Sequence, residues 1–184
     1  MAGWPVERAG VVETVVTTLG PNGRWNVAAL GVEDLAGDGP ASARTWGRTR
    51  TWRNFRERGG GYVQFTRDPV DFVEAALSVR EEEAPILDSA DAWVEIEAET
   101  SASGTDGGTE WTDWHLRAIE SSVERRVVPV TSRGRAAVVE ATVAASRLDV
   151  DAYDTDDLRD RLAYFEGVVE RCGAPRDREA FERA

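Results

Sequence analysis

Arginine is concentrated in the stretch from Arg44 to Pro69, RTWGRTRTWRNFRERGGGYVQFTRDP. Seven of the 22 basic residues fall between Arg44 and Arg67 with one acid, Glu57, so this stretch carries +6 in a chain whose formal net charge is −12. Threonine and aromatic residues are interleaved with the arginines, namely Trp46, Thr49, Thr51, Trp52, Phe55, Tyr62 and Thr66. Guanidinium groups bind phosphate oxygens in pairs, and aromatic rings pack against flat ligands. The composition predicts a site for an anion that carries a flat ring.

A helix start adds to this chemistry. The sequence predicts a short helix over residues 51–56 with Thr51 as its N-cap, directly after Arg48-Thr49-Arg50. The free N–H groups of a helix start attract anions, so arginine and helix would act at one place. The alternative interpretation is that these arginines form ordinary ion pairs that offset the acidic surface, and the sequence leaves both interpretations open.

Six strands are predicted to position this stretch. Two β-branched runs flank the turn Gly20-Pro21-Asn22-Gly23 and predict a β-hairpin. The six predicted strands are residues 10–19, 24–33, 41–48, 62–66, 93–96 and 111–130. The Gly/Ser/Thr-rich residues 100–109 are predicted to form a flexible hairpin tip.

Helices are predicted to follow the strands. Asp68-Pro69 is a helix start inserted between two of the strands, because an acid caps the helix and proline needs no N–H at the first position. After residue 130 the apolar period becomes helical, with starts at Thr131-Ser132 and at Asp154 and a last short helix within 175–183. The prediction is an α+β fold, an antiparallel six-stranded barrel over residues 1–130 with a C-terminal helical region, 131–184, packed on it.

The overall composition narrows the class of protein. A chain of 184 residues with 41% hydrophobic content and seven tryptophans has enough apolar residues for a folded core. All 22 basic residues are arginine, which a GC-rich genome or adaptation to molar salt would each explain, and the larger number of acids, 34, favours a halophile. No apolar run reaches the roughly 20 residues of a membrane span, so a cytoplasmic protein without membrane association is expected. Nucleic acid is not an expected partner, because phosphate contacts weaken as salt rises.

The remaining reactive side chains do not form a recognisable catalytic group. His115 is the single histidine and Cys172 the single cysteine, which argues against a metal site of the usual type and excludes an internal disulfide. The acidic residues 81–83 are interpreted as solvated surface, and Asp154, Asp156 and Asp157 as a helix start, rather than as cation ligands. The sequence assigns no catalytic residue and no metal ligand.

Four motifs in this order resemble a known family. They are N-x-A-A-x-G-V at 26–32, T-W-x-N-F at 51–55, T-x-D-P-x-x-F-V-x-A-A-L at 66–77 and V-V-E-A-T-V-A-A-S-R-L at 138–148. This combination is similar to the archaeal family known as domain of unknown function 447, which is related to the FMN-binding, flavin-reductase-like split-barrel proteins. The resemblance covers most of the chain.

The resemblance implies a split barrel, bound FMN and a homodimer with the flavin at the subunit interface. Asn26 and the backbone around Ala28 would border the isoalloxazine ring. The phosphate, the ribityl chain and the rest of the pocket would contact Arg48, Thr49, Thr51, Asn54, Thr66 and Arg67. This chain has Arg48-Thr49 where the family pattern has a Gly-Ser pair, which retains a hydroxyl and adds a charge.

Three functions remain open from the sequence. An FMN-dependent oxidoreductase of unknown substrate agrees with the chemistry that flavins supply. A flavin-binding carrier or sensor without turnover needs the same site. An RNA-binding protein would instead use the arginine and tryptophan residues for stacking and phosphate contacts.

Overall fold

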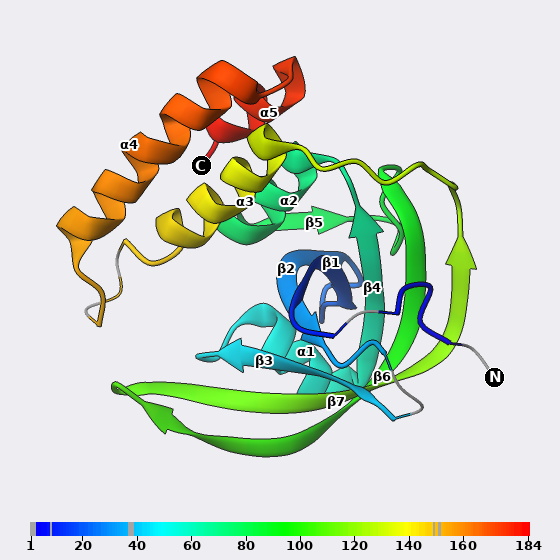
Figure 1. Ribbon diagram of the computed structural model, residues 1–184. Helices are drawn as coiled ribbons and strands as arrows, with labels where there is room; N and C mark the ends of the chain where they lie inside the picture. The colour runs from blue at the N-terminus through cyan, green and yellow to red at the C-terminus, as the bar shows by residue number, and fades with distance from the viewer. Residues whose placement is uncertain (1–2, 8, 37–38, 149, 151) are drawn as a thin grey trace. The chain divides into compact units, whose positions relative to one another are not determined.

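The computed structural model describes residues 3–7, 9–36, 39–148, 150 and 152–184, and the chain divides into two compact units. The barrel unit comprises residues 1–67 and 80–126, and the helical unit comprises residues 68–79 and 127–184. Seven strands and five helices are found within the described ranges (Figure 1). Among the described residues, no helix is both long and apolar enough to cross a membrane.

The strands of the barrel unit pair antiparallel throughout. They are β1 (Val12–Leu19), β2 (Trp25–Glu33), β3 (Ala41–Trp46), β4 (Gly60–Thr66), β5 (Arg80–Glu82), β6 (Ala90–Asp106) and β7 (Thr109–Val123). Six of them close into a ring in the order β1-β4-β6-β7-β3-β2, because β2 also pairs with β1. The predicted six-stranded antiparallel barrel and α+β class are therefore confirmed. The three-residue β5, which pairs with the start of β2, was not predicted because its residues Arg-Glu-Glu have low strand propensity.

Apolar side chains at alternate strand positions fill the barrel. Trp114, Leu116 and Val63 are almost completely buried there, and the Trp114 indole N–H donates to Thr45 Oγ1 at 2.9 Å. Phe55 of helix α1 (Arg50–Arg58) packs edge-on against Trp114 with ring centroids 5.2 Å apart. This contact anchors α1 to the barrel core.

Helix α1 begins two residues earlier than expected. Thr49 is the N-cap, and its hydroxyl accepts a hydrogen bond from the Trp52 backbone N–H at 3.2 Å. The prediction of Thr51 as the cap is wrong, because the Thr51 side chain is 5% exposed and faces Asn26 of β2. The helix ends at Gly59, whose φ of 76° suits the left-handed conformation that glycine adopts without strain.

The β6–β7 hairpin is longer and more regular than the glycine-rich sequence indicated. The two strands form the long curved ribbons at the bottom of Figure 1 and pair as far as Asp106 and Thr109. The predicted flexible tip over residues 100–109 is wrong, since the turn is confined to Gly107-Gly108, which have φ values of 53° and 85°. Hydroxyl side chains are compatible with a ladder whose backbone groups are paired. The last predicted strand also ends earlier, at Val123 instead of residue 130.

Helices form the second unit. They are α2 (Pro69–Leu77), α3 (Arg133–Ala145), α4 (Thr155–Cys172) and α5 (Pro175–Phe181). The predicted caps are confirmed, because Asp68, Ser132 and Asp154 each accept hydrogen bonds from backbone N–H groups of the helix that follows. The apolar cluster between these helices is Val70, Val73, Ala137, Val138, Val168, Val169 and Ala180.

Helix α2 lies between β4 and β5 in sequence but packs with the C-terminal helices. Its buried Val70 and Val73 belong to the core of the helical unit. The division into residues 1–130 and 131–184 stays a prediction, and the packing of α2 shows that the helical unit draws on two separate segments.

Candidate functional site

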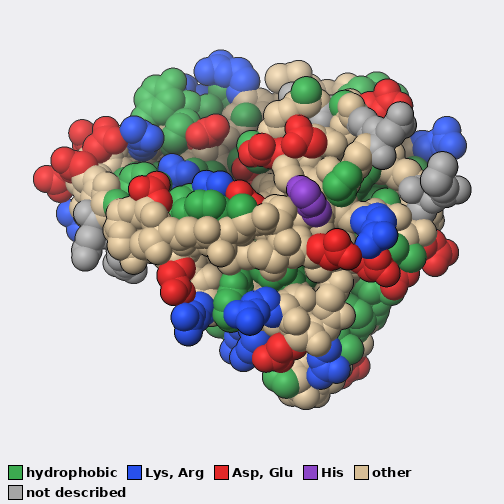
Figure 2. Space-filling view, turned by 90° about the horizontal axis from the view of Figure 1, so that it is seen from below, with side chains coloured by type: hydrophobic (Ala, Val, Ile, Leu, Met, Phe, Trp, Pro, Cys, Tyr) green, Lys and Arg blue, Asp and Glu red, His purple; other side chains and the backbone are tan. Residues whose placement is uncertain are grey.

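Ion pairs engage much of the arginine-rich stretch. Arg44 pairs with Asp113, Arg48 with Glu110, Arg50 with Glu81, and Arg67 with Asp91, at distances from 2.5 to 2.9 Å. On the face seen in Figure 2, acidic and basic side chains intermingle. The ion-pair interpretation therefore accounts for these arginines at the surface of the chain as it stands.

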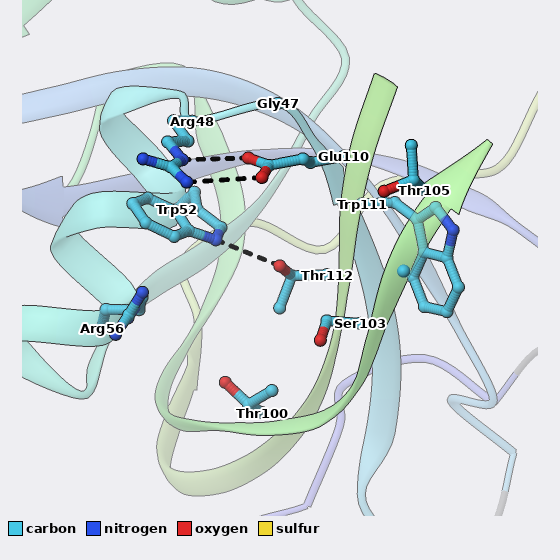
Figure 3. Close-up of a pocket in the computed structure, with 11 residues that line it drawn as sticks. Gly47, Arg48, Trp52, Arg56, Thr100, Ser103, Thr105, Glu110, Trp111 and Thr112 are labelled. Atoms are coloured by element: carbon cyan, nitrogen blue, oxygen red, sulfur yellow. Dashed lines mark hydrogen bonds and ion pairs between the residues drawn. The ribbon is translucent and has the colours of Figure 1, made fainter. Parts of the chain in front are cut away.

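A cleft of about 510 Å³ lies between the start of α1 and the β6–β7 hairpin (Figure 3). Arg48, Trp52 and Arg56 line it from the α1 side. The hairpin contributes Thr100, Ser103, Gly104, Thr105, Glu110, Trp111 and Thr112. The cleft thus combines two guanidinium groups, two indoles and four hydroxyls.

Trp52 is held in a defined orientation within this cleft. Its indole N–H donates to Thr112 Oγ1 at 3.0 Å, which joins α1 to β7. The Arg56 guanidinium carbon lies 4.9 Å from the Trp52 ring centroid, within the range of a cation–π contact. Among the described residues Arg56 has no ion-pair partner, so its charge is available to a ligand.

Arg48 and Glu110 form a bidentate ion pair at the rim of the cleft (Figure 3). Arg48 Nε donates to Glu110 Oε2 at 2.9 Å and Arg48 Nη2 donates to Oε1 at 3.3 Å. The hydrogen bonds to Glu110 raise the pKa of the Arg48 guanidinium above its ordinary value. Counting Arg48, Arg56 and Glu110, the charged residues of the cleft leave a net charge of +1.

Asn26, Thr51 and Asn54 come together in a buried polar cluster under α1. Asn26 Nδ2 donates to Thr51 Oγ1 at 3.5 Å, and Asn54 Nδ2 donates to Thr18 Oγ1 at 2.9 Å. Asn54 Oδ1 and the Nε atom of Arg53 are buried without a hydrogen-bond partner in the described structure. Most buried polar atoms are hydrogen-bonded, so these two atoms are an unsatisfied acceptor and an unsatisfied donor within α1.

The other sequence-predicted residues take different places. Thr49 uses its hydroxyl as the cap of α1, and Ala28 of β2 lies opposite Val16 and packs against the barrel core. Thr66 at the end of β4 and Arg67 directly after it bond Ser89 and Asp91 and do not line the cleft. Asn26, Arg48, Thr49, Thr51 and Asn54 belong to α1, cap it or contact it, whereas Thr66 and Arg67 bond another segment of the chain.

Sequence reasoning missed the hairpin side of the cleft. Thr100, Ser103 and Thr105 alternate poorly with apolar residues, so they were interpreted as a loop. Their register with Glu110 to Thr112 on β7 brings them to the cleft, and no local sequence signal reports that register. Arg56 and Trp52 belonged to the predicted stretch but were not assigned to the site.

His115 lies outside this cleft. It is exposed on β7, opposite Ser42 of β3 and Glu99 of β6. It borders a larger hollow on the barrel unit, of about 1290 Å³, that also contains Trp4, Leu35 and Arg117. In the described part of the chain no group of three His, Cys, Asp or Glu residues is placed to hold a metal ion.

The closed antiparallel ring of six strands is a split-barrel fold. The chain belongs to the family described as protein of unknown function DUF447, whose N-terminal domain matches residues 12–125 and whose second domain matches residues 132–183. The resemblance predicted from the four motifs is therefore confirmed.

Solved structures are similar to this chain to different degrees. An FMN-bound DUF447 protein from Methanosarcina mazei is 22% identical, with a TM-score of 0.78 over 96% of this chain and 94% of that one. Nitrilotriacetate monooxygenase component B from Bacillus cereus is 18% identical, with a TM-score of 0.48 over 66% and 72% of the two chains. The styrene monooxygenase flavin reductase from Pseudomonas putida S12 is 12% identical, with a TM-score of 0.47 over 65% and 93%. An origin in a halophile stays a prediction.

Proposed function

We propose that the protein binds FMN at the start of α1, in the cleft between α1 and the β6–β7 hairpin. The observation that carries this proposal is the lining of the cleft, in which Arg48, Arg56 and Trp52 face four hydroxyls of the hairpin. FMN has a doubly charged phosphate, a chain of hydroxyls and a flat ring, and each has a matching group in this lining. The FMN-bound relative of the same family supports the choice of ligand.

The residues present fit this cofactor in charge and size. The cleft volume of about 510 Å³ lies within the range of small-molecule sites. Arg48 and Arg56 would hold the phosphate, and the N–H groups at the start of α1 favour an anion there. Asn54 Oδ1 and Arg53 Nε lack a hydrogen-bond partner among the described residues, but neither residue lines the cleft, so they are not assigned to the ligand. Asn26 and Thr51 support this end of the helix from beneath.

Bound FMN would supply electron transfer, and an oxidoreductase of unidentified substrate is the activity that follows. The chain's own residues would bind the phosphate, orient the ring and limit access of water. Bleaching of bound flavin by NADH or NADPH tests this activity, and intact binding without bleaching would favour a carrier or sensor. The paired arginines and intermingled surface charges give less support to RNA binding.

A homodimer is part of the proposal. Thr66 and Arg67 do not line the cleft, so we assign them to a pocket that a second copy completes. Light scattering in molar salt should give twice the 20.2 kDa of one chain. A particle of one chain's mass in the presence of FMN would remove these two residues from the site.

The central experiment is a titration with FMN, riboflavin and FAD in molar salt, followed by flavin fluorescence. Wild-type protein should quench FMN at tens of micromolar or below, and FAD less. Arg48→Ala should weaken FMN binding by roughly tenfold to a hundredfold and leave riboflavin, which lacks the phosphate, nearly unchanged.

Arg117→Ala is the matched control, because Arg117 is also an ion-paired, exposed arginine but does not line the cleft. It should leave both affinities unchanged. Equal losses for FMN and riboflavin in Arg48→Ala would place this arginine away from the phosphate. Failure of wild-type protein to quench FMN would reject the proposed function.

A further inference from the structure

Glu110 holds the position on Arg48 that an anionic ligand would need. It is the acid among the residues that line the cleft, and it stands two residues after Gly108 at the turn of the β6–β7 hairpin. Its carboxylate oxygens accept from Arg48 Nε and Nη2 at 2.9 and 3.3 Å. A phosphate engages a guanidinium fork in the same two-point manner. Carboxylate and phosphate therefore compete for one pair of N–H groups.

The backbone keeps Glu110 at the cleft whether or not its side chain is paired. Its carbonyl oxygen accepts from the Gly47 N–H at 2.7 Å, on the residue just before Arg48. Thr112, two residues further along β7, is also held in place, because its hydroxyl accepts a hydrogen bond from the Trp52 indole N–H. The carboxylate can rotate away from Arg48, but it remains at the rim of the cleft.

The ion pair itself is weak enough to be exchanged. The Arg48 side chain is 71% exposed and that of Glu110 is 57% exposed. Exposed pairs contribute little to stability because water screens them. A dianionic phosphate, with more charge and more acceptor oxygens, would replace the carboxylate on the Arg48 guanidinium. The displaced Glu110 carboxylate would then repel the bound phosphate.

We propose that Glu110 is an internal competitor for the flavin phosphate, which holds the Arg48 fork in the cleft without ligand and sets the affinity for phosphorylated flavin. This role rests on the proposed FMN function and adds a specificity-determining residue to it. Glu110 acts through Arg48 and is a positioning residue, not a catalytic one. Its removal should strengthen binding of a phosphorylated ligand and leave an unphosphorylated one unchanged.

The test compares wild type, Glu110→Gln, Arg48→Ala and the double variant by titration with FMN and with riboflavin. Glu110→Gln should bind FMN about threefold to tenfold more tightly than wild type, with riboflavin affinity unchanged. In the Arg48→Ala background the same substitution should give a smaller gain in FMN affinity, because the guanidinium for which carboxylate and phosphate compete is absent. Glu99→Gln is the matched control, since Glu99 is an exposed hairpin acid paired with Arg117 and does not line the cleft.

Each result decides the matter. Unchanged or weaker FMN binding in Glu110→Gln overturns the competitor role while leaving the proposed function intact. An equal gain in Glu99→Gln, or the full gain in the Arg48→Ala background, also overturns it, because the effect would then be general charge removal. Absence of FMN binding in both wild type and Glu110→Gln overturns the proposed function and the competitor role together.

Discussion

Substitutions at Thr49 and Thr51 test the start of α1, on which the candidate site depends. Thr49→Ala removes the hydroxyl that accepts from the Trp52 N–H, and the expected loss is about 1 kcal/mol in the free energy of unfolding. Helix α1 has nine residues, too few to be stable without a cap and tertiary contacts. For a chain of this size a loss of about 1 kcal/mol lowers Tm by roughly 2 to 4 °C.

Replacement by serine separates the two threonines. Thr49 is exposed, so Thr49→Ser keeps the cap and should be nearly neutral. Thr51 is 5% exposed, so Thr51→Ser deletes a buried methyl group and should cost about 1 kcal/mol. If Thr51 were the cap, the serine variant at that position would be the neutral one.

Urea unfolding followed by tryptophan fluorescence is the assay. All seven tryptophans lie in the barrel unit, at positions 4, 25, 46, 52, 93, 111 and 114, so the signal reports the unit that contains α1. A Thr49→Ala variant within a few tenths of a kcal/mol of wild type would refute the assignment of the cap.

Three further substitutions follow from buried or strained contacts. Gln64→Leu should lower the free energy of unfolding in urea by about 2 to 4 kcal/mol, because the side chain is 0% exposed and the variant loses three hydrogen bonds. An unchanged free energy would show that the loop with Pro85 and Leu87, which Gln64 binds, is stable without these bonds. Gly134→Ala should destabilise the helical unit in thermal melts despite the helix propensity of alanine, because the added Cβ would lie 2.5 Å from Gly173 Cα. A higher Tm of this variant would contradict the close contact. Burial opposes the charge of Asp68, but hydrogen bonds from Arg176 and two backbone N–H groups outweigh it and hold its pKa below the ordinary value. The lowered pKa stabilises the folded state at any pH above the pKa of Asp68 in the unfolded chain, and this stability is lost as the pH falls through the pKa of Asp68 in the folded chain. The loss in free energy of unfolding that Asp68→Asn causes in urea should therefore shrink below about pH 4. A loss of the same size at about pH 2 would refute this role of Asp68.

Local chemistry in the sequence predicted much of the fold. β-branched runs around Gly20 to Gly23 predicted the first hairpin, and Asp68-Pro69 predicted the start of α2, because turn and cap preferences act over a few residues. The cap of α1 was misplaced by two residues, since Thr49 and Thr51 are chemically equal and only burial against Asn26 distinguishes them. Packing decided between two locally equivalent choices.

The site was predictable on the α1 side and not on the hairpin side. Arg48 was identified because its charge stands out in an acidic chain. Glu110 and Thr112 enter the cleft through the register of β7 against β3, which pairs Thr45 with Thr112 over a long sequence separation. No local pattern encodes that pairing, so half of the cleft lining could be found only in three dimensions.

The two segments of the helical unit have a consequence for synthesis of the chain. Helix α2 emerges from the ribosome well before residues 127–184, yet its buried Val70 and Val73 pack in one cluster with helices from that later segment. At about 5 to 20 residues per second the wait lasts on the order of seconds, much longer than helix formation takes. During this interval the apolar face of α2 lacks the helices that it packs against in the complete chain, so α2 is an element where a chaperone would engage. A chain stopped after residue 126 would lack these helices permanently, so removal of the C-terminal segment leaves Val70 and Val73 of α2 without the residues they pack against in this cluster.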